Sequence, residues 1–260
     1  MNRRFSTLAA CTFALLAAGC GGGGDTEETA ALVKTGQALE AKLGAPGANA
    51  RMPGKDDADV KAFDSEAEKG LTALGSDRLP VQGMDSYEKL CGPAAKIIAA
   101  YASAGVGTNA DGTLQTDDRA KVAAMSANVE RYMDQMFTPL LFAAHCTAVH
   151  IPKVEEQVDS KPEGKKAEAM AQIRNGAFGQ AAGLLQIVGD PSLDEAKRRK
   201  ALDLIARDAG NFAIAMSPEQ RQQFARLADA VGQAMPAAKA QADRIKAAAS
   251  KAPCGKLCSA

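Results

Sequence analysis

The hydrophobic pattern of this chain is helical over most of its length beyond the N-terminal stretch. Apolar side chains recur every three or four residues, with polar and charged side chains between them, as in the series Val60, Phe63, Ala67 and Leu71. This spacing places the apolar residues on one face of an α-helix, which completes a turn about every 3.6 residues. The pattern predicts helices over residues 27–43, 58–74, 85–101, 117–137, 138–146, 165–188, 192–205, 217–235 and 236–251.

Residues that favour helix starts and helix ends divide this pattern. Ser217–Gln220 contains the serine, proline and glutamine of a capping box, in which a side-chain hydroxyl accepts a backbone amide of the first turn. Ser192 and Glu195 predict the same arrangement one helix earlier. Residues 208–216 are expected to connect these two helices. The highly charged span 151–164, which contains prolines, is predicted to be a solvated connector within one domain.

Composition favours an all-α fold. The chain contains no tryptophan and 3 tyrosines, and it is rich in alanine, which suits helices better than sheets. The segment Leu140–Cys146 is apolar on every side and should be the most buried part of the protein. His145 within it is expected to be packed or hydrogen-bonded rather than catalytic. We therefore predict an all-α multi-helix bundle of roughly eight or nine helices, forming a single domain over residues 29–260.

The first twenty residues carry a different pattern, that of an export signal. Two arginines precede a short apolar run over residues 5–18, which falls short of the length needed to span a bilayer. The run ends in Leu16–Cys20, where a leucine and small residues precede a cysteine. This combination resembles the signal peptide of bacterial lipoproteins. The resemblance implies removal of residues 1–19 and attachment of acyl chains, such as palmitate, to Cys20. The alternative is ordinary secretion, which would leave this cysteine as a free thiol.

Residues 20–28 form the predicted lipidated cysteine and tether. Four glycines, Gly21–Gly24, follow Cys20, and such a run holds no fixed conformation because ordering glycine costs backbone entropy. Two acyl chains would hold the protein firmly to a membrane. Within the lipoprotein resemblance, glycine in place of an aspartate after the cysteine implies an outer-membrane destination facing the periplasm of a bacterium with two membranes. The membrane is therefore one expected partner, reached through the lipid anchor.

The remaining cysteines predict two disulfides. Four of them follow Cys20, and an exported protein meets an oxidising compartment. Three pairings are possible, and we favour pairing the first two with each other and the last two with each other. Zinc is the alternative because two histidines lie near the second cysteine, but the spacing matches no common zinc motif, so no metal and no cofactor are expected. The residues concerned are Cys91, Cys146, Cys254 and Cys258, with His145 and His150.

Three glycines fall on one face of the predicted helix over residues 165–188, at Gly176, Gly179 and Gly183. Each costs up to about 1 kcal/mol relative to alanine inside a helix, so their common spacing needs a reason. Close packing of a neighbouring helix is the favoured explanation. A groove for a ligand or for the backbone of a partner is the alternative.

The sequence contains no recognisable catalytic motif. G-x-S-x-G, P-loop, dinucleotide-binding and H-E-x-x-H patterns are missing and histidines number 2, so no catalytic residue is predicted. Basic and acidic residues balance at 31 each, which offers no field to attract nucleic acid. We expect a non-catalytic envelope lipoprotein that binds an envelope or periplasmic partner protein, with immunity to, or inhibition of, a toxin as one form. The alternatives are a helical bundle that binds a small molecule or a haem-type cofactor, and an envelope hydrolase.

Overall fold

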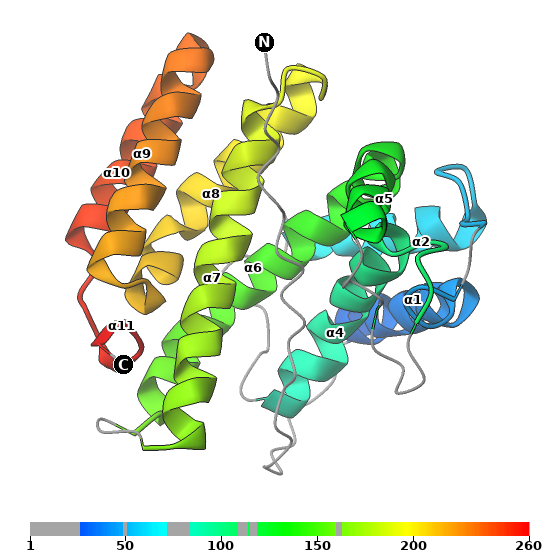
Figure 1. Cartoon of the computed structure of the whole chain (residues 1–260), viewed down its shortest axis with the longest axis horizontal. Helices are drawn as coiled ribbons and strands as arrows, with labels where there is room; N and C mark the ends of the chain where they lie inside the picture. Colours follow the sequence, from blue (N-terminus) through cyan, green and yellow to red (C-terminus); the bar gives the residue numbers. More distant parts are fainter. Residues whose placement is uncertain are drawn as a thin grey trace. The chain divides into compact units, whose positions relative to one another are not determined.

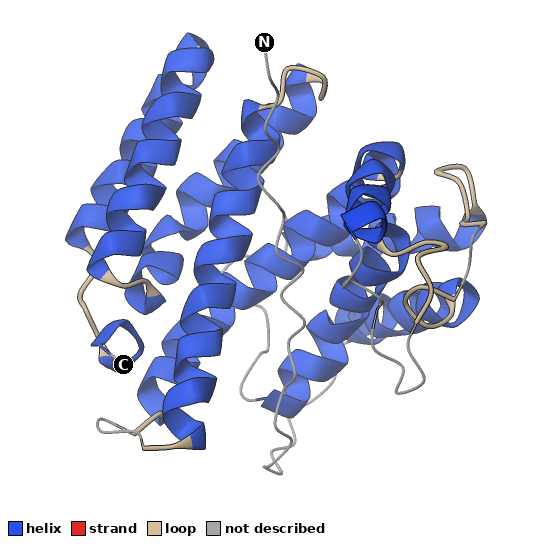
Figure 2. Ribbon diagram, viewed as in Figure 1, coloured by secondary structure: helices blue, strands red, loops and turns tan. Residues whose placement is uncertain are grey.

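A computed structural model of the chain describes residues 27–48, 51–71, 84–108, 114, 119–159 and 163–259. Helices dominate these residues (Figure 2), and the sole β pairing within them is an isolated bridge between Thr108 and Leu114. The all-α prediction is confirmed. The predicted signal peptide, Cys20 and the glycines that follow it lie outside the described residues.

The described residues form ten α-helices and a short 3₁₀ turn, labelled in Figure 1. The predicted helices over 27–43 and 165–188 match α1 and α7 within one residue at each end. The elements are α1 Glu27–Leu43, α2 Ala58–Lys69, α4 Met84–Ala102, α5 Arg119–Arg131, α6 Met133–Gln157, α7 Lys165–Gly189, α8 Glu195–Ala215, α9 Pro218–Ala234, η2 Pro236–Ala238, α10 Lys239–Lys251 and α11 Lys256–Ser259.

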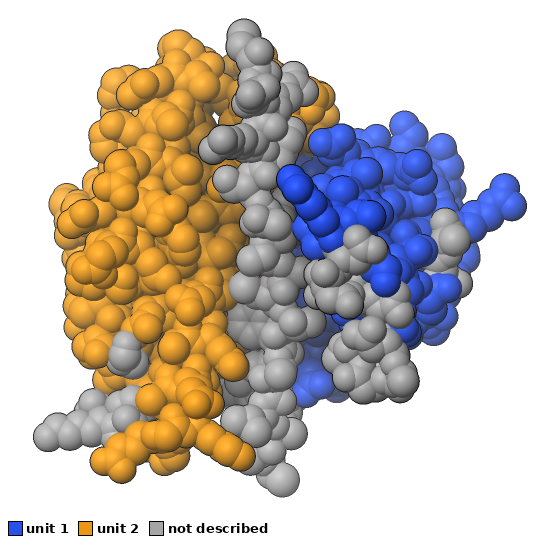
Figure 3. Space-filling model, viewed as in Figure 1, with its two compact units in different colours: residues 1–10, 19–143 blue, residues 11–18, 144–260 orange. Residues whose placement is uncertain are grey.

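These elements belong to two compact units (Figure 3). The first contains α1, α2, α4, α5 and the start of α6 through Ala143. The second contains the rest of α6, from Ala144, and α7 to α11. Each unit has buried apolar side chains of its own. The single domain expected over residues 29–260 stays a prediction.

In the first unit, α1 packs against both α2 and α4. The approach to α4 is close because α1 has a glycine there. A Cβ atom added to Gly36 would lie 2.8 Å from the Cβ of Pro93 and 3.3 Å from the ring of Phe63. Pro93 lies inside α4, where its missing N–H is expected to restart or bend the helix. No restart occurs, and the buried proline ring instead forms part of the surface on which α1 packs.

The residue that helix α5 buries is polar. Its apolar stripe of Val122, Met125 and Val129 is only half-buried. The buried residue of α5 is Asn128, whose side-chain amide donates to the carbonyl oxygens of Ala102, the last residue of α4, at 3.2 Å and of Ala104, just past it, at 2.9 Å. Carbonyls at a helix end have no partner within the helix. Asn128 supplies one, and this polar contact sets the face that α5 turns inward.

In the second unit, α7 and α10 each pack against both α8 and α9. Figure 1 shows α9 and α10 side by side, joined through the turn at Pro236–Ala238. A Cβ atom added to Gly232 of α9 would lie 3.0 Å from the Cβ of Ala242 of α10, so these helices approach closely. The capping box predicted for α9 is confirmed. The Ser217 hydroxyl accepts the amide of Gln220, and the Gln220 side chain accepts the amide of Ser217.

Helix α8 differs from its prediction at both ends. Asp194, rather than Ser192, is the N-cap residue, and its carboxylate accepts the backbone amide of Lys197 at 2.9 Å. The stretch 208–216, expected to be a connection, is helical almost to its end. The reason is that buried residues such as Phe212 continue the apolar face of the helix past the polar positions between them.

Helix α6 begins earlier and ends later than predicted. The sequence predicts one helix over residues 117–137 and a second over 138–146, but the break falls at Tyr132, and α6 spans Met133–Gln157. Ile151, expected in a connector, is buried within α6. Burial of such side chains stabilises a helix through positions whose local sequence disfavours it, so the connector between α6 and α7 is much shorter than predicted.

Candidate functional site

The second unit contains a buried ion pair between α6 and α8. The side chains of His145 on α6 and Asp208 on α8 are 0% and 1% exposed, and the Nδ1 atom of the imidazole lies 2.7 Å from Oδ2 of the carboxylate. Burying a carboxylate without partners is very costly, so it needs compensating hydrogen bonds. The histidine supplies one of them.

Arg207, the neighbour of the aspartate on α8, supplies the others. Its Nε atom donates to Oδ1 of Asp208 at 2.9 Å, and its Nη2 atom donates to Oδ2 at 3.2 Å. Such a two-pronged contact between guanidinium and carboxylate is among the strongest hydrogen-bonding arrangements in proteins. The Arg207 side chain remains 36% exposed. The cluster therefore links the buried aspartate to the surface through a cation.

Two polar groups converge on one nitrogen of the His145 ring. The Nδ1 atom of His145 lies 2.7 Å from Nη2 of Arg207 as well as from the Asp208 carboxylate. A neutral ring nitrogen either donates one hydrogen bond or accepts one. A proton on Nδ1 is donated to the Asp208 carboxylate, whereas a bare Nδ1 accepts from the Arg207 guanidinium. Both polar neighbours therefore face Nδ1, and neither faces Nε2.

The Nε2 atom of His145 is buried and has no hydrogen-bond partner among the described residues. A carboxylate that orients Nδ1 while Nε2 stays available is the arrangement found around catalytic histidines and histidines that bind metals. Here the ring is closed off from solvent, and no group of three or more histidine, cysteine or acidic side chains suited to a metal gathers within the described parts of the chain. The cluster fits a packing role between α6 and α8 and leaves one nitrogen that a small ligand could use.

The second histidine, His150, lies just over one turn further along α6 and is also buried. Burial lowers the pKa of His150 from 6.5 to about 4, because transfer out of water disfavours the charged imidazolium. The imidazole is therefore neutral at pH 7. The sequence pairs the two histidines as candidate zinc ligands, but the structure gives them separate surroundings: an aspartate and an arginine face the first, and burial governs the second.

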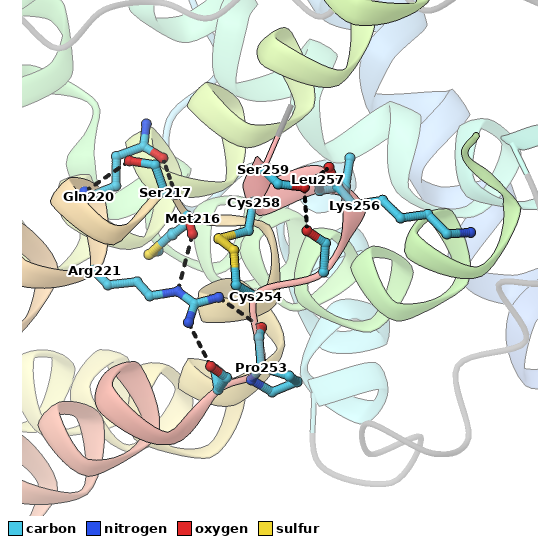
Figure 4. The surroundings of a disulfide bond; sticks show 12 residues. Met216, Ser217, Gln220, Arg221, Pro253, Cys254, Lys256, Leu257, Cys258 and Ser259 are labelled. Atoms are coloured by element: carbon cyan, nitrogen blue, oxygen red, sulfur yellow. Dashed lines mark hydrogen bonds between the residues drawn. A yellow bond between two sulfur atoms is a disulfide. The ribbon is translucent and has the colours of Figure 1, made fainter. Parts of the chain in front are cut away.

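The cysteines after Cys20 are all disulfide-bonded, as predicted. Cys254 and Cys258 form one disulfide, with their Cα atoms 5.3 Å apart, in the C-terminal segment drawn in Figure 4. Cys91 of α4 and Cys146 of α6 are also disulfide-bonded and are buried. Both disulfides expected of an exported chain are therefore formed, which removes these four thiols as free nucleophiles or zinc ligands.

The three glycines predicted to share a packing face or a groove are not equally covered. Gly176 and Gly183 of α7 are buried, whereas Gly179 between them is exposed. Burial at the outer two positions favours close packing there, because only glycine lets a neighbour approach the helix backbone so nearly. Both explanations of the stripe remain predictions.

The sequence indicated His145 of the buried cluster but not its two partners. The Leu140–Cys146 segment marks His145 as buried, and that prediction is confirmed at 0% exposure. Asp208 and Arg207 escaped notice because they fall at the start of a predicted connection. The signal that could have found them is the continued helical spacing of Ile205, Ala209 and Phe212, which places position 208 on the same buried face.

No helix in the described residues combines the length and apolar character needed to cross a membrane.

Comparison with known proteins identifies no relative of this chain. No family model matches the chain, and no curated protein and no solved structure is significantly similar to it.

Proposed function

We propose that this chain is a non-catalytic envelope lipoprotein that binds a partner protein at the periplasmic face of the outer membrane. The anchor rests on the sequence Leu16–Cys20 and on the glycines behind it. Residues 21–26 separate Cys20 from the start of α1 at Glu27. Even fully extended, this tether spans at most roughly 25 Å. The first helical unit would therefore meet partners close to the membrane surface.

One observation carries the choice of a protein partner: the apolar face of α5 is incompletely covered. Val122, Met125 and Val129 recur at helical spacing on one side of α5, and all three are only half-buried. Ala123, on the opposite side, is exposed. Apolar surface that folding leaves in water can be buried by a partner, at roughly 25 cal/mol per Å². A short helix with such a stripe presents anchors for a complementary protein surface.

The surroundings of the reactive side chains support a role without catalysis. His145 and His150 are both buried, and the four described cysteines are bound in disulfides. A general base or nucleophile must reach its substrate to act. Inhibition of a toxin aimed at the envelope, as an immunity protein performs it, is the form of partner binding that a rigid helical protein tethered near the membrane would suit.

Affinity purification of the lipidated protein from its own membranes tests this proposal. We expect a protein to co-purify at stoichiometric ratio with the wild type. Met125→Glu places a charge in the half-buried stripe and should reduce recovery of that protein at least about tenfold. Ala123→Glu is the matched control on the opposite face of α5 and should leave recovery unchanged. Equal recovery with both variants would exclude α5 as the surface, and failure of any protein to co-purify would exclude the partner proposal.

A small-molecule or cofactor-binding bundle is the second candidate, and the unpartnered Nε2 atom of His145 favours it. A buried nitrogen without a hydrogen-bond partner, in a ring held by a carboxylate, could form a hydrogen bond with a bound group or coordinate it. Native mass spectrometry and an absorption spectrum of the protein purified from its source organism test this candidate. A bound mass that is lost in His145→Ala supports it; the bare mass of the chain with no visible absorption speaks against it.

A further inference from the structure

The C-terminal segment of the chain is held to the end of α6 by reciprocal contacts. The Glu155 carboxylate of α6 accepts the backbone amides of Lys256 and Leu257, the second of them at 3.0 Å. In return, the Lys256 ammonium donates to the carbonyl oxygen of Val158 at 2.8 Å, just past the end of α6. Glu155 thus accepts backbone amides at the start of α11, and Lys256 donates to a carbonyl at the end of α6. Neither kind of group has a hydrogen-bond partner within its own helix.

Arg221 also holds the C-terminal segment, through hydrogen bonds to its carbonyl oxygens. Its guanidinium donates to the carbonyl oxygen of Met216 at 3.1 Å, to that of Ala252 at 2.6 Å and to that of Pro253 at 2.8 Å. Figure 4 shows the guanidinium of Arg221 on α9 reaching toward Pro253, beside the disulfide. We call residues 252–259 the C-terminal cap.

Packing in the cap is close but involves only a short segment. A Cβ atom added to Gly255 would overlap the Glu155 carboxylate, so glycine is needed for this approach. Leu257 and Cys258 are buried, and α11 contacts α7 and α8. However, α11 has 4 residues, far below the length at which a helix is stable in water. The cap therefore keeps its shape through its tertiary contacts and through the disulfide that closes it.

The two cysteines of the cap differ in solvent exposure. Cys254 is exposed, whereas Cys258 is 4% exposed. By contrast, Cys91 and Cys146 are 2% and 0% exposed. A thiolate must reach a sulfur atom to break a disulfide, so the exposed cysteine of the cap is where a reductant can attack first.

We propose that the Cys254–Cys258 disulfide is a reducible latch, opened by a dithiol, that releases the C-terminal cap from the end of α6 while the helices of the second unit stay packed. A dithiol thiolate attacks the sulfur of Cys254, the disulfide bond breaks, and Cys258 leaves as a thiolate that takes up a proton. The second thiol of the dithiol, as its thiolate, attacks the mixed disulfide and frees Cys254. The dithiol becomes its cyclic disulfide, and the protein has gained two electrons and two protons. This latch does not depend on the proposed partner.

Selective reduction of the native protein tests the access argument. The folded chain is treated with dithiothreitol, trapped with iodoacetamide at intervals and analysed by peptide mass spectrometry. We expect labelling at Cys254 and Cys258 at least about tenfold faster than at Cys91 and Cys146. Equal rates at all four cysteines, or faster labelling of the buried pair, would overturn the proposal.

Hydrogen exchange tests the opening itself. After selective reduction, the backbone amides of Lys256 and Leu257 should exchange at least about tenfold faster, while amides in the middle of α8 and α10 keep their protection. The double variant Cys254→Ser, Cys258→Ser should match the reduced protein. In the oxidised protein, Glu155→Gln should show part of the effect and the exposed neighbour Glu156→Gln none. Unchanged exchange at the cap after reduction, or loss of protection throughout the second unit, would show that the disulfide is not a local latch.

Discussion

The Nδ1 atom of His145 lies 2.7 Å from the Oδ2 atom of Asp208, with both side chains closed off from solvent between α6 and α8. Asp208→Ala removes the carboxylate that the imidazole of His145 and the Arg207 guanidinium share. Removing one member of a buried ion pair typically costs about 3–5 kcal/mol of unfolding free energy. We expect a loss of this size, measured by urea denaturation.

The matched control for this substitution lies on the same helix. Asp203 of α8 is exposed and accepts a hydrogen bond from Gln241, so Asp203→Ala should cost less than about 1 kcal/mol. The paired substitution His145→Leu, Asp208→Leu removes both buried polar groups and should cost less than the sum of the single variants. Equal losses for the two aspartates would mean that the buried pair contributes no more than a surface contact.

The sequence predicted helices well and helix ends poorly. Periodicity located α1 and α7 because their apolar faces are continuous and their ends carry few competing signals. It misplaced the start of α8 because Ser192 and Asp194 both suit an N-cap, and tertiary packing chooses between them. Spacing also shows that the face of α5 with Val122 and Met125 is apolar, but not what covers it. The face that α5 turns inward carries its own Asn128, whose two carbonyl partners lie 26 and 24 residues earlier in the chain.

The same limit applies to the candidate site. Local pattern showed that His145 is buried, because seven consecutive positions around it, Leu140–Cys146, are almost all apolar. Nothing local indicates its partner 63 residues further along the chain. A buried charge is recognised only when the helix that carries it is extended correctly, and Asp208 falls where the polar residues of α8 suggest an end. The contacts of the C-terminal cap with Glu155 join residues about a hundred positions apart and could not be derived from spacing at all.

The burial of His150 leads us to expect that the free energy of unfolding falls in mild acid. Burial lowers the pKa of His150 to about 4 from its ordinary value of 6.5, so between these pH values the unfolded chain binds a proton that the folded chain does not. The unfolding free energy should therefore decrease as pH falls from about 6.5 to 4, by up to about 3 kcal/mol from this residue. Denaturation curves of the wild type and of His150→Gln at pH 7, 6, 5 and 4 would measure it. The two proteins should differ in their pH dependence over this window, and parallel curves would contradict the assignment.

Two glycine substitutions should change stability in opposite directions. Gly36→Ala places a Cβ atom 2.8 Å from the Cβ of Pro93, and this overlap should outweigh the better helix propensity of alanine, for a net loss of roughly 1–2 kcal/mol. Gly210→Ala adds a Cβ atom within α8 that meets nothing within 4 Å, so it should gain about 0.5–1 kcal/mol. Thermal and urea unfolding of both variants provide the comparison. A stabilising Gly36→Ala would show that α1 and α4 can move apart at little cost.

The proposed lipid anchor makes the most direct prediction about location. If Cys20 carries acyl chains, Cys20→Ala should shift the protein from the membrane pellet to the soluble fraction, because the chain then loses the hydrophobic attachment that the acyl chains supply. Cys254→Ser, which changes a cysteine without touching the anchor, should stay in the pellet after a carbonate wash. Mass spectrometry of the N-terminal peptide should find the acyl mass on Cys20 in the wild type and an unmodified, differently processed N-terminus in the variant. A Cys20→Ala protein that remains in the carbonate-washed membrane would show that something other than an acyl anchor holds this chain there.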